Sequence, residues 1–424
     1  MDKMRPTFSK GGKLGWLHST YDAFETFAAV PSTTTSGKVH IKDCVDIKRV
    51  MIVVVMALMP AFCFGMWNTG DQHAMAFGLQ WGFWMKVWYG FYRILPLILV
   101  SYIVGLGIEF AVAQARGHEV NEGYLVTGFL IPLIMPIDVP LWVLALAVAF
   151  AVIFGKEIFG GTGMNIWNPA LLARAFVFFA YPSTITGDTV WIGGLGKHAD
   201  QVIDGFSGAT PLAQLADTGT CPDFMQMFIG NIPGSFGETS TIAILLGAVL
   251  LLWTGVASWK IMVSCVAGAI AVGTLAVGFD ASLTHLVMGG FAFGAVFMAT
   301  DPVSSAQTET GKWIYGFLIG AMCIILRLFN PGYREGMMLA ILLMNTMAPL
   351  IDWCVVRKNI RRREKRADGS QHCGIVGLQS SAVDDCKSSG LPLDETGHLR
   401  YVGLVRRSLS GSDGPYRFVG DYDL

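Results

Sequence analysis

Long apolar stretches separated by short polar connections run through most of the chain. A helix needs about 20 mostly apolar residues to cross a bilayer, and ten stretches come close to this length. The pattern therefore predicts an all-α polytopic membrane protein with about ten transmembrane helices. The expected spans are residues 50–67, 91–112, 123–138, 140–157, 167–181, 239–257, 259–278, 284–300, 313–329 and 336–356.

Composition supports this class and excludes others. Of the 424 residues, 53% are hydrophobic and 14% are charged, whereas a soluble domain carries about 25% charged residues. A disordered chain is excluded, and a soluble enzyme is disfavoured. The net charge of −1 provides no basic field for nucleic acid. The eight cysteines form no CxxC motif, so we expect no metal or iron–sulfur site within this chain.

Basic residues predict the orientation. Residues 1–49 contain eight Lys or Arg and residues 357–366 contain seven, and both segments flank a span directly. Clustered Lys and Arg remain cytoplasmic, so we expect both termini in the cytoplasm and an even number of spans. The connection 182–238 follows five spans and would face the periplasm. It carries one Lys against six Asp or Glu.

The expected organisation has five parts. Segments 127–169 and 289–331 share a Gly- or Pro-broken apolar stretch, then a span, then Asn-Pro. This similarity predicts an inverted repeat of two five-helix halves, with ligand sites at their interface; chance similarity between apolar sequences is the alternative. The parts are a cytoplasmic N-terminal segment (1–49), the first half (50–181), a periplasmic loop (182–238), the second half (239–356), and a basic exit with a disordered tail (357–424).

The periplasmic loop contains the segment 204–211, DGFSGATP. Thr210 before Pro211 is a common helix start, with Thr as N-cap. A second interpretation uses the same residues. The small side chains at 207–209 let a bulky group approach the backbone, and the Thr210 hydroxyl could then carry a covalent modification, with Asp204 helping a modifying enzyme to recognise the site.

The spacing DxxSGAT at 204–210 resembles the recognition pattern for covalent FMN attachment. Segments such as HEVNEGYLVTG (118–128), GKEIFGGTGMNIWNPALLARAFVFFAYP (155–182) and NPGYREGMMLAILLMNTMAPLID (330–352) resemble a flavin-carrying membrane subunit of the Na+-translocating NADH:quinone oxidoreductases (the Nqr complex). The related Rnf complex has a similar flavin-carrying subunit. The resemblance covers about residues 40–366, and it gives no role to the tail.

The resemblance implies a set of site residues. FMN would be joined to Thr210 through a phosphoester, with Asp204, Ser207, Gly208 and Ala209 as the attachment motif. Riboflavin would bind at Asn165, Asn168 and Thr162; quinone at Gly105, Leu106 and Glu109; and Na+ at Glu109 and Asp352. These residues can also be explained by structural roles alone. The Asn residues can cap helices, the glycines can allow close helix packing, and the carboxylates can lie at the membrane interface. Arg174 lies inside an expected span and needs a partner, which the sequence does not identify.

The implied function is that of a membrane subunit of a respiratory enzyme. It would couple electron transfer through covalent FMN and riboflavin to ubiquinone with Na+ export across the bacterial inner membrane. Its partners would be subunits that carry FAD, FMN and iron–sulfur centres, and a flavin transferase. Two alternatives remain: an Rnf-type ferredoxin:NAD oxidoreductase subunit, and a non-redox transporter with an inverted repeat, for which DxxSGAT would have no use.

Overall fold

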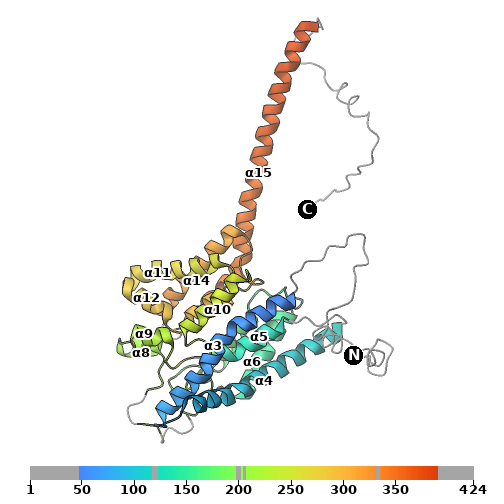
Figure 1. The fold of residues 1–424 in the computed structure, drawn as a ribbon. Helices are drawn as coiled ribbons and strands as arrows, with labels where there is room; N and C mark the ends of the chain where they lie inside the picture. Colours follow the sequence, from blue (N-terminus) through green and yellow to red (C-terminus); the bar gives the residue numbers. More distant parts are fainter. Residues whose placement is uncertain (1–46, 117–122, 197–201, 204–206, 331–334, 390–424) are drawn as a thin grey trace, which may run out of the picture. The chain divides into compact units, whose positions relative to one another are not determined.

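The computed structural model describes residues 47–116, 123–196, 202–203, 207–330 and 335–389, with side chains between 50 and 366. Every regular element in these ranges is a helix (Figure 1), which confirms the all-α prediction. The chain divides into two compact units, Met1–Val356 and Arg357–Leu424.

Among the described residues, five helices are long and apolar enough to cross a membrane, so this is a multi-pass membrane protein. They are α3 (Ile47–Ala76), α4 (Phe83–Arg116), α11 (Trp259–Val277), α14 (Glu309–Phe329) and the first part of α15 (Met337–Ser389). A sixth candidate is a pair bent by 72°, formed by Phe279–Val287 and Phe291–Met298. The first segment is α12; the second is α13 (Phe291–Phe293) continued by the π-helix η5 (Gly294–Met298).

The remaining predicted spans contain shorter helices. They are α5 (Tyr124–Ile134), α6 (Leu141–Val152) with its π-helical continuation η2 (Ile153–Glu157), α7 (Pro169–Ala180) and α10 (Thr241–Trp253). Proline explains two of the ends. Pro136 follows α5 closely, and Pro169 occupies the first position of α7, where its ring suits a helix start. All ten predicted stretches therefore contain a helix, while ten complete spans and the inverted repeat stay predictions.

Several boundaries differ from those that the apolar pattern predicts. Helix α3 ends nine residues later than expected, at Ala76, and helix α4 begins eight residues earlier than expected. The eighth stretch is broken at Gly289, whose φ of +57° favours glycine. Helix α15 continues through 389, well beyond the apolar part that ends near 356. Arg, Lys and Glu are good helix formers, so the polar residues after 356 can continue a helix that an apolar pattern alone would end.

Close helix packing in the first unit depends on glycine. Helix α11 packs along α14, and α3 packs against α4 and α10. A Cβ at Gly268 in α11 would lie 2.1 Å from the carbonyl oxygen of Phe317, and one at Gly320 in α14 would lie 1.9 Å from that of Cys265. The two backbones approach because both residues lack a side chain, as is common where membrane helices cross.

In its described residues, the connection between α7 and α10 holds three short helices. These are η3 (Pro182–Thr184), α8 (Pro211–Thr218) and α9 (Phe224–Ile229). The first of the two cavities described below is lined by residues of this connection.

Candidate functional site

Thr210 begins helix α8. Its Oγ1 accepts a hydrogen bond from the backbone N–H of Ala213 at 3.3 Å, and Pro211 occupies the first helical position. The helix-cap interpretation of Thr210 is therefore confirmed. The same geometry places the Thr210 oxygen at the positive end of the α8 dipole, where an anionic group is favoured.

The small residues before Thr210 form a tight turn. A Cβ at Gly208 would lie 2.2 Å from the carbonyl oxygen of Asp188, so only glycine fits there. The backbone N–H of Ala209 donates to Oγ of Ser207 at 3.2 Å, and Nε2 of Gln214 donates to the Ala209 carbonyl at 2.9 Å. Asp204 lies outside the described residues.

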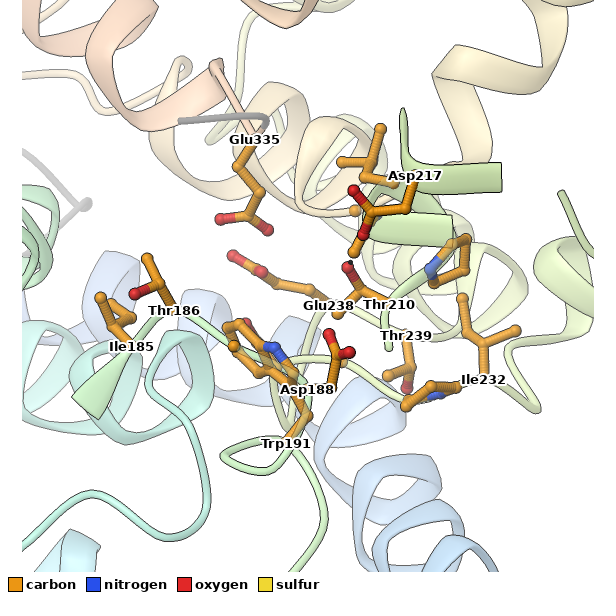
Figure 2. Close-up of a pocket in the computed structure, with 18 of the residues that line it drawn as sticks. Ile185, Thr186, Asp188, Trp191, Thr210, Asp217, Ile232, Glu238, Thr239 and Glu335 are labelled. Atoms are coloured by element: carbon orange, nitrogen blue, oxygen red, sulfur yellow. Dashed lines mark hydrogen bonds between the residues drawn. The ribbon is translucent and has the colours of Figure 1, made fainter. Parts of the chain in front are cut away.

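A cavity of ≈ 330 Å³ lies beside Thr210 (Figure 2). Its volume falls within the range of about 300–1,000 Å³ of small-molecule sites. Most of its lining comes from the connection between α7 and α10, at residues 185–191, 210–217 and 232–239. Arg174 of α7, Gly289 after α12 and Glu335 before α15 complete the lining. The charged residues of its wall are Arg174, Asp188, Asp217, Glu238 and Glu335.

Arg174 finds its partners on this wall. Its Nη1 donates to Oε1 of Glu238 at 2.6 Å, and its Nη2 donates to Oε2 of Glu335. Only 3% of the Arg174 side chain is exposed, and a buried charge requires such pairing. The network joins α7 to the turn before α10 and to the residue that precedes α15. Sequence reasoning had identified the need for a partner but not Glu238 or Glu335.

Glu238 also presents an unsatisfied atom. Its Oε2 is buried and has no hydrogen-bond partner among the described residues. Burial raises the pKa of Glu238, and the Glu335 carboxylate adds to this, whereas the Arg174 guanidinium lowers it. A buried acceptor without a donor on a cavity wall is expected where a ligand completes the site.

A second cavity, of ≈ 100 Å³, brings together Thr162, Asn165 and Asn168. These are the three residues for which the resemblance implies riboflavin binding. They follow η2 and precede α7. The rest of the lining comes from the start of α3 and from residues 123–130, 251–257 and 297–303. The cavity is therefore lined by both of the predicted halves, as the repeat hypothesis expects for a ligand site.

The two asparagines have local structural roles. Oδ1 of Asn168 accepts from the N–H of Ala170 at 3.0 Å and caps α7, while its Nδ2 donates to Asp301 at 3.4 Å. Nδ2 of Asn165 donates to the Trp167 carbonyl at 3.0 Å. The capping interpretation of Asn168 is confirmed. In the described part of the chain, Oγ1 of Thr162 is buried without a partner, so this hydroxyl can still bind a ligand.

Two charged residues, Lys156 and Asp301, are among the lining residues of the second cavity. Asp301 accepts hydrogen bonds from the hydroxyl of Ser304 at 2.8 Å and the N–H of Val303 at 3.2 Å, besides that from Asn168. Burial raises the pKa of Asp301, and these three donors lower it. The cavity thus contains one cationic and one acidic side chain.

Lys156 connects this cavity to Glu109. Its Nζ donates to Oε1 of Glu109 in α4, and the two side chains are 5% and 4% exposed. Glu109 is therefore buried within the protein and paired with a cation that also lines the second cavity.

Gly105, the first residue of the implied quinone site, accommodates an aromatic ring. A Cβ at Gly105 would lie 1.9 Å from Cζ of Tyr124, whose hydroxyl donates to the Ser101 carbonyl at 2.9 Å. The packing interpretation of Gly105 is confirmed. Leu106 is half-buried. Neither Gly105 nor Leu106 lines either of the two cavities, and quinone binding here stays a prediction.

Asp352 is a residue of α15, and its carboxylate contacts the start of α14. Its carboxylate accepts from the N–H groups of Gln307 at 2.7 Å and Thr308 at 3.0 Å, and from the Thr308 hydroxyl at 2.6 Å. Asp352 therefore attaches α15 to the N-terminus of α14, where a carboxylate is favoured. It has a different set of partners from Glu109.

Comparison with known proteins identifies the family. The model of the NQR2, RnfD, RnfE family matches residues 34–361. The chain belongs to this family. Three relatives, each named as a subunit of a Na(+)-translocating NADH-quinone reductase, come from Klebsiella pneumoniae subsp. pneumoniae, Chromohalobacter salexigens and Haemophilus influenzae. The Klebsiella protein is 43% identical over 86% of this chain and 98% of its own length. The Chromohalobacter protein is 43% identical over 86% and 95%, respectively. The Haemophilus protein is 42% identical over 87% and 98%, respectively.

These matches confirm the resemblance on which the expected sites depend. The region that matches the NQR2, RnfD, RnfE family contains both cavities and the described helices from α3 to the apolar part of α15. The family model ends at residue 361, close to the limit near 366 that the sequence analysis gave. The relatives are subunits of a quinone reductase, an oxidoreductase complex.

Proposed function

We propose that the chain is the membrane subunit of a redox-driven Na+ pump. It couples electron transfer through covalent FMN and riboflavin to ubiquinone with Na+ export. In this proposal it crosses the bacterial inner membrane ten times as two inverted halves, with both termini in the cytoplasm. It works with subunits that carry FAD, FMN and iron–sulfur centres, after a flavin transferase has modified it. The observation that carries the proposal is the cavity beside Thr210.

The Thr210 site suits a flavin phosphoester. The ester phosphate would lie at the N-terminus of α8, where backbone N–H groups and the helix dipole stabilise negative charge. The cavity has the volume of a ligand site, with Trp191 on its wall and the unpaired Oε2 of Glu238 available to accept a hydrogen bond. The flavin supplies the redox chemistry when bound. Arg174 and its two carboxylate partners hold the wall in place.

The second cavity suits a flavin without a phosphate. Its one lysine and one aspartate balance each other, so it offers no excess positive charge for a phosphate, and the Thr162 hydroxyl can bind one polar ring atom. At ≈ 100 Å³ it is smaller than a site that encloses a whole ligand. We therefore propose that this chain holds one edge of riboflavin and that neighbouring subunits cover the remainder.

Na+ handling is assigned to two carboxylates, the buried Glu109 and the half-buried Asp352. Moving one charge against 100 mV costs about 2.3 kcal/mol, which the electron-transfer steps must supply. Carboxylate oxygens suit a hard cation, and Glu109 and Asp352 are the proposed ligands. Glu109 is the stronger candidate because it lies within a spanning helix, where a buried ionisable group is by default a functional hypothesis.

Covalent flavin on a denaturing gel tests the proposal. We expect the wild-type protein, produced with its flavin transferase, to fluoresce yellow-green under ultraviolet light, and we expect Thr210→Ala to be dark. Thr186→Ala is the matched control, because Thr186 is another hydroxyl residue on the same cavity wall and should remain fluorescent. A dark wild type with the mass of the bare chain would leave Thr210 as a helix cap and favour the transporter alternative.

The Rnf-type alternative is kept because the family includes the Rnf subunits. A quinone-reduction assay of the purified complex separates the two, since only the Nqr-type complex passes electrons to quinone.

A further inference from the structure

We infer that Lys156 is a movable counter-ion shared by Glu109 and the second cavity, so that Na+ binds Glu109 when the Lys156 ammonium turns toward negative charge in the cavity. This inference rests on the proposed function, because it takes Na+ and the noncovalent flavin as given. It adds the residue that links them.

The position of Lys156 is the first argument. Lys156 lies in the π-helix η2, with its ammonium on Glu109 of α4, while its side chain also lines the cavity that contains Thr162 and Asn165. Tyr124 lies beside the ammonium, with the ring centroid 6.0 Å from Nζ. One buried cation therefore faces both the proposed Na+ ligand and the proposed flavin site.

The surrounding charges leave Lys156 as the cation that can move. Asp301, the acidic residue of the same cavity wall, is held by three hydrogen bonds. Arg116 is held by Glu157, since its Nη2 donates to the Glu157 carbonyl at 2.9 Å. A lysine ammonium has a flexible four-carbon stem. It can rotate between two anionic partners without a change in the backbone.

Competition at Glu109 supplies the coupling. A buried ion pair has paid the desolvation cost of both charges, so the Glu109 carboxylate is costly to leave without a cation. An ammonium and a Na+ ion cannot both occupy the position next to Oε1. Negative charge in the cavity attracts the ammonium, and Na+ then replaces it at Glu109.

The charges balance in this exchange. One electron reaches the cavity from a reduced carrier of the complex, and one Na+ enters at Glu109, so the net charge of the region is unchanged. Lys156 keeps its proton, and no covalent bond forms or breaks. When the electron leaves for quinone, the ammonium returns to Glu109 and displaces Na+.

The test measures the midpoint potential of the noncovalent flavin in the complete complex, at low and at high Na+ with choline as the replacement cation. In wild type we expect the potential to rise with Na+. In Lys156→Met we expect the potential to become independent of Na+. In the quinone-reduction assay of the same variant, we expect the half-saturating Na+ concentration to fall about tenfold, because the competing ammonium is gone; coupling between sites is commonly 5- to 150-fold. A Na+ dependence equal to wild type in Lys156→Met would overturn the inference.

Two further variants keep the test decisive. Glu109→Gln releases the Lys156 ammonium to the cavity. The midpoint potential of the noncovalent flavin in this variant should therefore be above that of wild type at low Na+, and it should not change with Na+. If Lys156→Met fails to assemble, this variant decides alone, and a wild-type response in it overturns the inference. Lys86→Met is the matched control: Lys86 is an α4 lysine paired with Asp71 at 2.5 Å, it lines neither cavity, and it should behave as wild type.

Flavin extraction separates two kinds of failure. A wild-type complex without noncovalent flavin overturns the proposed function and this inference together. A wild-type complex that contains the flavin, with Lys156→Met unchanged, overturns this inference alone.

Discussion

Nη1 of Arg174 lies 2.6 Å from Oε1 of Glu238, and both side chains are buried in the wall of the cavity beside Thr210. The pair connects α7 to the turn before α10. Because neither charge is solvated, each depends on the other, and the cavity wall depends on both.

Removing one member of this pair should be costly. We expect Arg174→Met to lower the stability of the protein by about 3–5 kcal/mol, because the Glu238 carboxylate would be buried without its partner. Thermal unfolding in detergent measures the loss. Lys260→Met is the control, since its partner Glu309 is 65% exposed and a solvent-exposed ion pair adds little to stability. Equal shifts in the two variants would contradict the prediction.

The two roles of Thr210 can be separated by substitution. Asn is among the best N-cap residues but has no hydroxyl. Thr210→Asn should therefore lose covalent flavin while the stability changes by less than about 1 kcal/mol, whereas Thr210→Ala should lose flavin and also about 0.5–2 kcal/mol of stability. In-gel fluorescence and a thermal melt measure the two effects. Flavin on Thr210→Asn would place the attachment at another residue.

Gly105 and Gly107 form a matched pair in α4. Gly105→Ala should destabilise the protein by about 1–3 kcal/mol, because its Cβ would overlap the Tyr124 ring. Gly107→Ala should be neutral or stabilising, because no described atom lies within 4 Å of its Cβ position and alanine favours a helix. Thermal melts check both.

Quinone reduction then tests how Gly105 acts. If the activity lost in Gly105→Ala returns in the double variant with Tyr124→Leu, Gly105 acts through the ring that it accommodates. No recovery in a stable double variant would favour direct contact with quinone.

Asp352 can be tested in the same way. Asp352→Ala removes all three hydrogen bonds at the start of α14 and should cost about 0.5–2 kcal/mol, as for other helix caps. Asp352→Asn keeps one acceptor oxygen for Thr308 but loses the charge and the acceptor for the Gln307 N–H, so its stability should fall between that of wild type and that of Asp352→Ala. A change in the half-saturating Na+ concentration for Asp352→Asn would assign Asp352 to cation binding. An unchanged value would leave it as a cap.

Features formed by neighbouring residues could be predicted from the sequence. The cap at Thr210 and the cap at Asn168 each depend on residues two or three positions away, and both were expected from the Thr-Pro and Asn-Pro pairs. The apolar stretches likewise indicated where the helices lie, because each stretch is continuous in sequence.

Features that join distant residues could not be predicted. Arg174 is 64 residues from Glu238 and 161 residues from Glu335, so no spacing relates them. The sequence predicts that Gly105 allows a neighbouring segment to pack closely against α4. It does not indicate that the neighbour is the aromatic ring of Tyr124. Lys156 was assigned no role, because its contact with Glu109 depends on how α6 and α4 pack and on the π-helix between Ile153 and Glu157.

The wide turn of η2 has a consequence for insertions and deletions in this chain. The N–H of Ile158 bonds to the carbonyl of Ile153 at 3.0 Å, five residues back, so the turn contains one residue more than an α-helical turn. Each residue of an α-helix advances by about 100° around the axis. Deleting one residue from the η2 turn would rotate α6 by about 100° relative to the loop that follows. Lys156 would then face away from α4, although no residue that contacts a ligand had been replaced.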